Sequence, residues 1–243
     1  MKLKILSLDF DGTLVHPNIA TEEIYSKVFE ELFPHEFKRK FDEFESEYLN
    51  TIPDLKNDFR NFGKLSPEDR KKLYYHWNNE RLKFLFPNLS EYQRKQTLEE
   101  IMKNLFQNQR PVLFPEVKAC LKYFKKLNLT LNILSGNNKK YASRFLQKEK
   151  LENTFNDIYT PDFLNMPKKD LFNNYKKNGN HLEEILHVGD DPELDYITPK
   201  SLGLKALWLK RIDHRYNDGT IPKEDVIMTL SDLKEIIENK INQ

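Results

Sequence analysis

Short apolar runs alternate along this chain with longer segments of helical periodicity. Each run is about as long as a strand and almost continuously apolar, which is typical of strands covered on both faces. Runs of this kind separated by helical segments predict βα units and a parallel sheet. Strands are expected at residues 3–9, 129–136, 184–191 and 205–211.

Two helices near these runs have clear starting signals. Pro115 and Glu116 open one segment, and Ser231 can cap a final helix close to the carboxyl end. Apolar residues recur at helical spacing in both segments. They are Val117, Leu121, Phe124 and Leu127 in the first, and Leu233, Ile236, Ile237 and Ile241 in the second.

The stretch between the first and second strands is too long for an ordinary crossover and has a purely helical character. Helices are expected to begin near Thr21, at Ser66 with Pro67 in the first helical position, and near Ser90. Their apolar and aromatic stripes are expected to pack within the insert. The stripes comprise Ile24, Val28, Leu32, Leu73, Trp77, Phe84, Leu98, Ile101, Met102 and Leu105.

The whole pattern predicts an α/β fold with a Rossmann-like parallel-sheet core and an inserted all-helical domain. The core is expected to comprise residues 1–16 and 108–243, and the insert residues 17–107. Pro17 and the sequence NQRP at 108–111 mark the expected crossings between the two.

Composition narrows the classes of function. Lys and Arg nearly balance Asp and Glu, and a net charge of +1 gives no field that would concentrate nucleic acid or an anionic membrane. The lone Cys120 excludes an internal disulfide and a cysteine-cluster metal site. The first apolar run ends at Asp9, too early for a secretory signal or a membrane span. We therefore expect a soluble, cytoplasmic protein without nucleic-acid or membrane partners.

Two acids, Asp9 and Asp11, close the first apolar run in the sequence LSLDFDGTLV. Residues two apart in an extended strand face the same side, so both side chains can point beyond the carboxyl end of the strand. Two converging carboxylates repel each other unless a cation lies between them or one of them is protonated, and the pair suggests a divalent metal with oxygen ligands. Gly12 lets the chain turn, and Thr13 offers a hydroxyl to an anion. A polar turn without function is the alternative for Asp-Gly alone.

The string DFDGTLV resembles the first motif of the haloacid dehalogenase-like (HAD) hydrolases, and two further motifs follow in the family's order. The sequence LNILSG supplies Ser135 at the end of an apolar strand, and HVGDDPELD supplies Asp190 and Asp195. The resemblance covers essentially the whole chain, and the helical insert matches a cap domain placed after the first motif. The run HPNIATEEIYSKVFEEL resembles the cap entry of a REG-2-like subgroup of the family.

The lysine motif of the family is where this chain departs from the pattern. Many relatives have Lys-Pro-Asp-Pro before an apolar-Phe pair, whereas this chain reads MPKKDLF. An ungapped register would place Met166 at the lysine position. A short deletion offers Lys168, which we favour, or Lys169.

The resemblance implies a Mg²⁺-dependent phosphatase acting on a small phosphorylated metabolite. Asp9 would be the nucleophile that forms an aspartyl-phosphate, and Asp11 the general acid and base. Mg²⁺ would be held by Asp9, the Asp11 backbone carbonyl and Asp190, with Asp195 close to the metal or orienting the lysine. The phosphoryl oxygens would be bound by Thr13, Ser135, the Gly136 amide and Lys168.

Several alternatives remain open at this point. Dehalogenases of the family lack an acid at the second position, so Asp11 favours phosphoryl transfer over dehalogenation. A phosphomutase of the same family is the near alternative, and a non-catalytic or regulatory HAD-fold binding protein is a more distant one. His187 precedes the final motif on a strand and is interpreted as a core histidine. The sequence leaves the specific substrate and the oligomeric state open.

Overall fold

The structure is a computed structural model that describes residues 3–19, 21–33, 67–108, 110–136, 139–160, 168–211 and 221–241. Ser66, the expected cap of a helix, lies outside these residues, as does Met166. The chain forms two compact units. One comprises Met1–His16 and Val112–Gln243, and the other Pro17–Pro111.

Parallel strands form a six-stranded sheet in the first unit, in the order β5-β4-β1-β6-β7-β8. Four of these strands confirm the prediction from the apolar runs, and the α/β class is confirmed with them. Strands β5 and β8 were missed because each is too short to give a periodic signal. The bounds are β1 Ile5–Leu8, β4 Thr130–Leu134, β5 Asp157–Tyr159, β6 Ile185–Gly189, β7 Lys205–Leu209 and β8 Val226–Ile227.

Helices cover both faces of this sheet, which explains why all four residues of β1 are buried. Leu6 and Leu8 belong to a core cluster with apolar residues of α6, α7 and α10. Ile5, one position out of phase, packs in a separate cluster with residues of α8. The bounds are α6 Val117–Lys126, α7 Lys139–Lys148, α8 Lys168–Lys177 and α10 Asp232–Ile241.

The register of the central strands brings their carboxyl ends to one level. Leu8 of β1 pairs with Ile133 of β4 and with Val188 of β6. The residues that follow these three positions therefore emerge side by side at the same edge of the sheet. In open α/β sheets this edge is where ligands bind.

Predicted helix starts agree closely with the structure. Glu116 is the N-cap of α6, and α10 begins directly after Ser231. The Asp232 carboxylate accepts hydrogen bonds from the Met228 and Thr229 amides, both at 2.9 Å. Shorter helices complete the unit: η1 Leu182–Glu184, the π-helical η2 Pro192–Ile197, α9 Thr198–Ser201 and η3 Lys223–Asp225.

A separate two-stranded sheet pairs β2, Val15–Pro17, with β3, Pro111–Leu113. Neither strand was predicted, because three residues are too few to show an alternating pattern. The amide of Asn18 adds a hydrogen bond to the Arg110 carbonyl at 2.8 Å. Segments about ninety residues apart in sequence are thereby joined.

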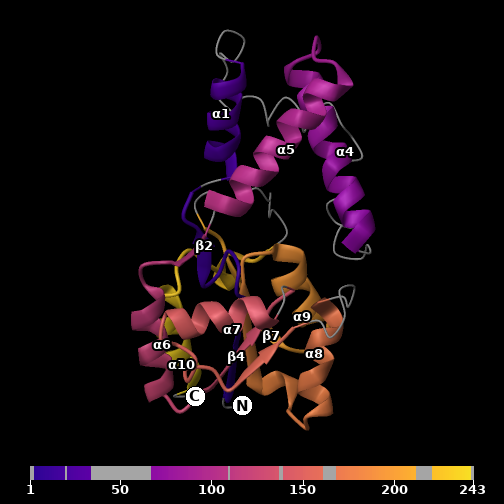
Figure 1. The fold of residues 1–243 in the computed structure, drawn as a ribbon. Coiled ribbons are helices and arrows are strands. Elements are labelled where there is room, and N and C mark those ends of the chain that lie inside the picture. The colour runs from indigo at the N-terminus through magenta and orange to yellow at the C-terminus, as the bar shows by residue number, and fades with distance from the viewer. Residues whose placement is uncertain are drawn as a thin grey trace. The chain divides into compact units, whose positions relative to one another are not determined.

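The described part of the second unit is helical, as the sequence predicts. It contains α1 Thr21–Leu32, α4 Pro67–Leu85 and α5 Glu91–Asn108 (Figure 1). The helices share an apolar cluster formed by Tyr25, Val28, Phe29, Trp77, Leu82, Phe86, Leu98 and Ile101.

The prediction that the apolar stripes of the insert are packed is wrong for two residues. Leu32 is 45% exposed and Phe84 is 40% exposed. Leu32 is the last residue of α1 and Phe84 the penultimate residue of α4, so both lie at helix ends, where helices fray. Within the described residues, none of the helices is both long enough and apolar enough to span a membrane.

Candidate active site

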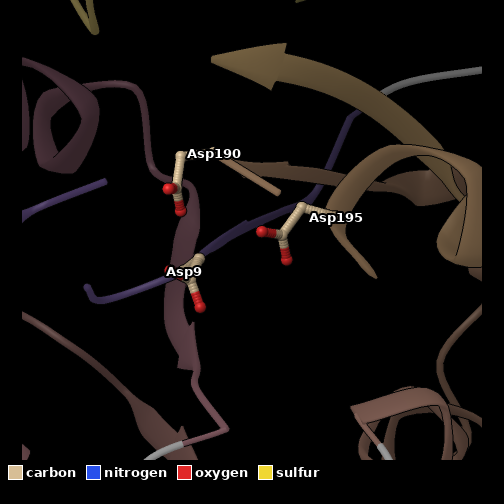
Figure 2. Close-up of side chains that lie close together, drawn as sticks. All are labelled: Asp9, Asp190 and Asp195. Atoms are coloured by element: carbon tan, nitrogen blue, oxygen red, sulfur yellow. The ribbon is translucent and has the colours of Figure 1, made fainter. Parts of the chain in front are cut away.

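Three carboxylates meet beyond the carboxyl ends of β1 and β6 (Figure 2). Asp9 directly follows β1, Asp190 directly follows β6, and Asp195 lies on η2. Each contributes one carboxylate oxygen to a group in which all three oxygens lie within 4.8 Å of one another. The fold therefore brings together three of the acids that the sequence singled out.

Lys168 inserts its ammonium group between two of these acids. It is the first residue of α8, and its Nζ lies 2.5 Å from Asp9 Oδ1 and 2.5 Å from Asp195 Oδ1. Its side chain is only 7% exposed, whereas the neighbouring Lys169 is exposed. Of the two lysines that the sequence offered, Lys168 is the one that reaches the acids.

The charges of the cluster do not balance without a further cation. Burial, together with the nearby carboxylates of Asp195 and Asp190, raises the pKa of Asp9 well above its usual range, although Lys168 acts in the opposite direction. Burial alone would lower the pKa of Lys168, but the attraction of Asp195 and Asp9 outweighs it and raises the pKa. One lysine among three carboxylates thus leaves negative charge that a bound cation would offset.

Residues around the cluster fit a divalent metal by their donor chemistry. Carboxylate oxygens are the ligands that Mg²⁺ prefers, and the three clustered oxygens come from two strand ends and the short helix η2. Asp9 is both buried and disfavoured as an anion by its acidic neighbours, which a divalent cation would reverse. Asp9, Asp190 and Asp195 are therefore the residues that would hold the metal.

Asp11 lies beside the acidic cluster rather than in it. Its carboxylate is half-buried, and its Oδ1 lies 3.5 Å from the hydroxyl of Tyr141 on α7. Burial and, to a smaller extent, the negative charge of Asp11 raise the pKa of Tyr141 to about 12. Tyr141 thus stays a neutral donor next to Asp11. The expected metal contact of the Asp11 backbone carbonyl stays a prediction.

The expected phosphate-binding groups lie on loops at the same sheet edge. Thr13 is fully buried, and within the described part of the chain its Oγ1 has no hydrogen-bond partner. Ser135 directly follows β4, is 1% exposed and donates its amide to the Tyr159 carbonyl at 3.0 Å. A Cβ atom added to Gly136 would meet nothing within 4 Å, so its backbone borders open space. A buried hydroxyl without a partner fits a bound anion.

His187 was interpreted from the sequence as a core histidine, and it is fully buried. Its ring also takes part in the site, because Nε2 lies 3.0 Å from Asp195 Oδ1 and Nδ1 lies 2.8 Å from Ser7 Oγ. Burial lowers the pKa of His187, so the imidazole is neutral near pH 7. Its position two residues before Gly189 of the GDD sequence was the available signal, since residues two apart on a strand share a face.

Arg211 is a second residue that sequence reasoning missed. Its Nη2 donates to the Thr13 carbonyl at 2.8 Å, and its Nη1 lies 2.6 Å from Glu116 Oε1. The guanidinium also lies 3.6 Å from the ring centroid of Phe114. Arg211 therefore ties the loop after β1 to the start of α6. No local pattern marked it, because its partners are distant in sequence.

A comparison with protein families matches residues 7–209 to the model of the haloacid dehalogenase-like hydrolases. This match covers most of the chain and includes the loops after β1, β4 and β6. A search of curated proteins by sequence finds no match.

Solved structures share the fold over almost the full length. A HAD phosphatase from Thermococcus onnurineus is 22% identical, with a TM-score of 0.53, over 97% of this chain and 98% of that one. YfnB from Bacillus subtilis, described as a HAD hydrolase and solved with magnesium, is 18% identical, with a TM-score of 0.61, over 98% and 100%. The L-2-haloacid dehalogenase RSc1362 is 14% identical, with a TM-score of 0.61, over 98% and 100%. At these identities the likeness concerns the fold alone.

Proposed function

The chain belongs to the haloacid dehalogenase-like hydrolases, and from that membership we propose that it is a Mg²⁺-dependent phosphatase. Its substrate is a small phosphomonoester, hydrolysed through an aspartyl-phosphate. The observation that carries the proposal is the position of Asp9, buried at the end of β1 with Lys168 at 2.5 Å and Asp190 and Asp195 beside it. This arrangement presents a carboxylate nucleophile to an anionic group and supplies positive charge next to it.

The first half of the reaction transfers the phosphoryl group to the protein. A carboxylate oxygen of Asp9 forms a bond to phosphorus while the bond from phosphorus to the ester oxygen breaks. Asp11 donates its proton to that leaving oxygen, so the product departs as a neutral alcohol. Thr13, Ser135 and the Gly136 amide bind the equatorial phosphoryl oxygens, where negative charge is spread in the transition state.

The second half returns the protein to its starting state. Asp11, now a carboxylate, takes a proton from a water molecule as the water oxygen attacks phosphorus. The bond between phosphorus and the Asp9 oxygen breaks, which releases inorganic phosphate and restores Asp9 as the carboxylate and Asp11 as the protonated acid. Lys168 keeps the Asp9 side chain in place through both steps, because its ammonium group is itself held by Asp195.

The bound Mg²⁺ would supply charge neutralisation for the phosphoryl oxygens and the clustered carboxylates. Asp9, Asp190 and Asp195 are the side chains proposed to hold it. Asp11 supports phosphoryl transfer over dehalogenation, because displacing a halide from carbon needs no proton donor for a leaving oxygen.

Further parts of the proposal concern the insert and the setting. We propose that residues 17–107 act as a cap that selects the substrate, and that the chain belongs to the REG-2-like subgroup. The helical character of α1, α4 and α5 supports the first point, and the sequence run after the first motif supports the second. The lone, buried Cys120 supports a cytoplasmic setting, where thiols stay reduced.

Hydrolysis of p-nitrophenyl phosphate with and without Mg²⁺ tests the proposal. We expect Mg²⁺-dependent phosphate release by the wild type. We also expect a loss of at least about 10³-fold in kcat for Asp9→Asn and of about 10²- to 10⁴-fold for Asp11→Asn. A screen of metabolite phosphates, read by free phosphate, then identifies the substrate.

Three results would contradict the proposal. Equal, slow hydrolysis by wild type and Asp9→Asn would show that the reaction does not proceed through an aspartyl-phosphate on Asp9. Halide release from an L-2-haloacid without phosphatase activity would point to a dehalogenase. Isomerisation of a sugar phosphate faster than phosphate release would point to a phosphomutase.

A further inference from the structure

A chain of hydrogen bonds runs from inside the sheet to the acidic cluster. Ser7 on β1 and His187 on β6 are partners in the parallel register, and both are fully buried. Ser7 Oγ lies 2.8 Å from His187 Nδ1, and His187 Nε2 lies 3.0 Å from Asp195 Oδ1. The same oxygen of Asp195 lies 2.5 Å from Lys168 Nζ. These hydrogen bonds therefore connect the middle of the sheet to Lys168, which contacts Asp9.

The hydrogen-bond partners of His187 determine which of its two ring nitrogens carries the proton. Asp195 is held ionised by Lys168 and accepts hydrogen bonds, so His187 Nε2 must carry the proton that faces it. A neutral imidazole has a single N–H, which leaves Nδ1 as an acceptor. The Ser7 hydroxyl therefore donates to Nδ1, which stabilises the tautomer that Asp195 selects.

Asp195 is held at both carboxylate oxygens. Oδ1 accepts from Lys168 and His187, and Oδ2 accepts from the Asp191 amide at 3.0 Å. A carboxylate has about four acceptor sites, so these three donors leave about one for a metal or a water molecule. The orientation of that remaining site depends on the donors that hold the other three.

The imidazole itself cannot turn freely. The ring of Phe172 on α8 packs edge-on against it, with ring centroids 4.8 Å apart and an interplanar angle of 87°. A Cβ atom on Gly189 would lie 2.3 Å from Asp195 Cγ, so the backbone of β6 also confines the carboxylate. Packing thus restricts both the His187 imidazole and the Asp195 carboxylate that it hydrogen-bonds.

We propose that His187 is a positioning residue that orients Asp195 toward Lys168 and the metal, and that the hydrogen bond from Ser7 supports the tautomer in which His187 does so. The proposal rests on the proposed function for its metal. Partners of a metal-binding carboxylate affect metal affinity without touching the ion, typically by about 10- to 100-fold. A histidine that merely filled space in the core would not affect it.

Substitutions at His187 separate the two roles. Glutamine can donate to Asp195 and accept from Ser7, whereas leucine fills the space and does neither. We expect His187→Leu to weaken Mg²⁺ binding, measured by calorimetry, by about 10- to 100-fold and to lower kcat, with His187→Gln close to the wild type. Ser7→Ala should weaken Mg²⁺ binding by a smaller factor, because His187 keeps its bond to Asp195.

Leu186→Ala is the matched control, since Leu186 precedes His187 on β6 and packs in the apolar core. It should lower thermal stability while leaving the Mg²⁺ dissociation constant unchanged. Equal Mg²⁺ affinity and kcat in folded His187→Leu and wild type would overturn the proposal, as would His187→Gln behaving like His187→Leu.

Nitrogen NMR of the wild-type imidazoles gives an outcome that needs neither metal nor substrate. The His187 signals, assigned by their loss in His187→Gln, should show the proton on Nε2. A proton on Nδ1 would overturn the inference even in an active phosphatase. A wild type with the Nε2 proton but without Mg²⁺ binding or phosphatase activity would instead overturn the proposed function, and with it the metal-directed role of His187.

Discussion

The carboxylate of Asp190 occupies the space in which residue 12 would carry a side chain. A Cβ atom on Gly12 would lie 2.2 Å from Asp190 Oδ2, and Gly12 has a φ of +74°. The first loop therefore approaches the second one so closely that only glycine fits. Gly12 therefore has two roles: it allows the turn after β1, and it leaves room for the carboxylate of Asp190, which follows β6.

Gly12→Ala should displace Asp190 or the loop after β1. The new methyl group overlaps the carboxylate, and the left-handed backbone adds about 1–2 kcal/mol of strain. We expect at least about a 100-fold loss of phosphatase activity and weaker Mg²⁺ binding, because shifts of about 1 Å already cost that much. Activity and calorimetry would measure both effects. An alanine variant with wild-type activity would show that the loops can separate without consequence.

Lys168→Met and Lys169→Met should differ sharply. Lys168 contacts Asp9 and Asp195, whereas Lys169 is exposed, so only the first substitution removes positive charge from the site. We expect Lys168→Met to lower kcat by about 10²- to 10³-fold and Lys169→Met to leave it unchanged. Steady-state kinetics on the same aryl phosphate would decide. A larger loss for Lys169→Met would reassign the lysine of the motif.

Thr13→Val should separate stability from activity. The Thr13 hydroxyl is buried, and it has no hydrogen-bond partner in the part of the chain the structure describes. Replacing this hydroxyl by a methyl group therefore removes no hydrogen bond within that part of the folded protein. The free energy of unfolding should stay the same or rise slightly. A bound phosphoryl group would lose a charged hydrogen bond, so kcat/KM should decrease by about 10- to 100-fold. Denaturant unfolding and kinetics would test the pair, and a stability loss of several kcal/mol would contradict it.

Ionised Glu116 should stabilise the protein, and this stabilisation should be lost in acid. Burial alone would raise its pKa, but the hydrogen bond and positive charge of Arg211, together with hydrogen bonds from backbone amides, outweigh burial and lower the pKa below its usual value of 4.5. Below pH 4.5 the unfolded state therefore binds a proton that the folded state does not. The stabilisation is fully present above about pH 4.5 and is lost as the pH falls through the lowered value.

Glu116→Gln should accordingly reduce the change in unfolding free energy between about pH 5 and pH 3. The expected contribution is about 1.5–3 kcal/mol, the range of hydrogen bonds to charged groups. Arg211→Met should flatten the profile in the same way, and the double variant should flatten it no further, because the two residues share one interaction. Additive effects in a urea titration across this range would refute the coupling.

The apolar runs and the acids that follow them were sufficient to place much of the fold and part of the site. Four sheet strands, the starts of α6 and α10, and the helical insert follow from periodicity, which depends on neighbouring residues alone. Asp9, Ser135 and Asp190 each lie at the carboxyl end of a predicted strand. Parallel strands end at one edge, so their proximity required no knowledge of long-range packing.

Other features were decided by the tertiary structure. Ser7 and His187 are 180 positions apart and meet because β1 and β6 pair in one particular register. The choice of Lys168 over Lys169 depends on how α8 is rotated against the sheet, and Arg211 reaches Thr13 across separate loops. A sequence pattern records which side chains share a strand or helix face. The contacts between faces depend on strand register and helix packing, which are set by the whole folded core.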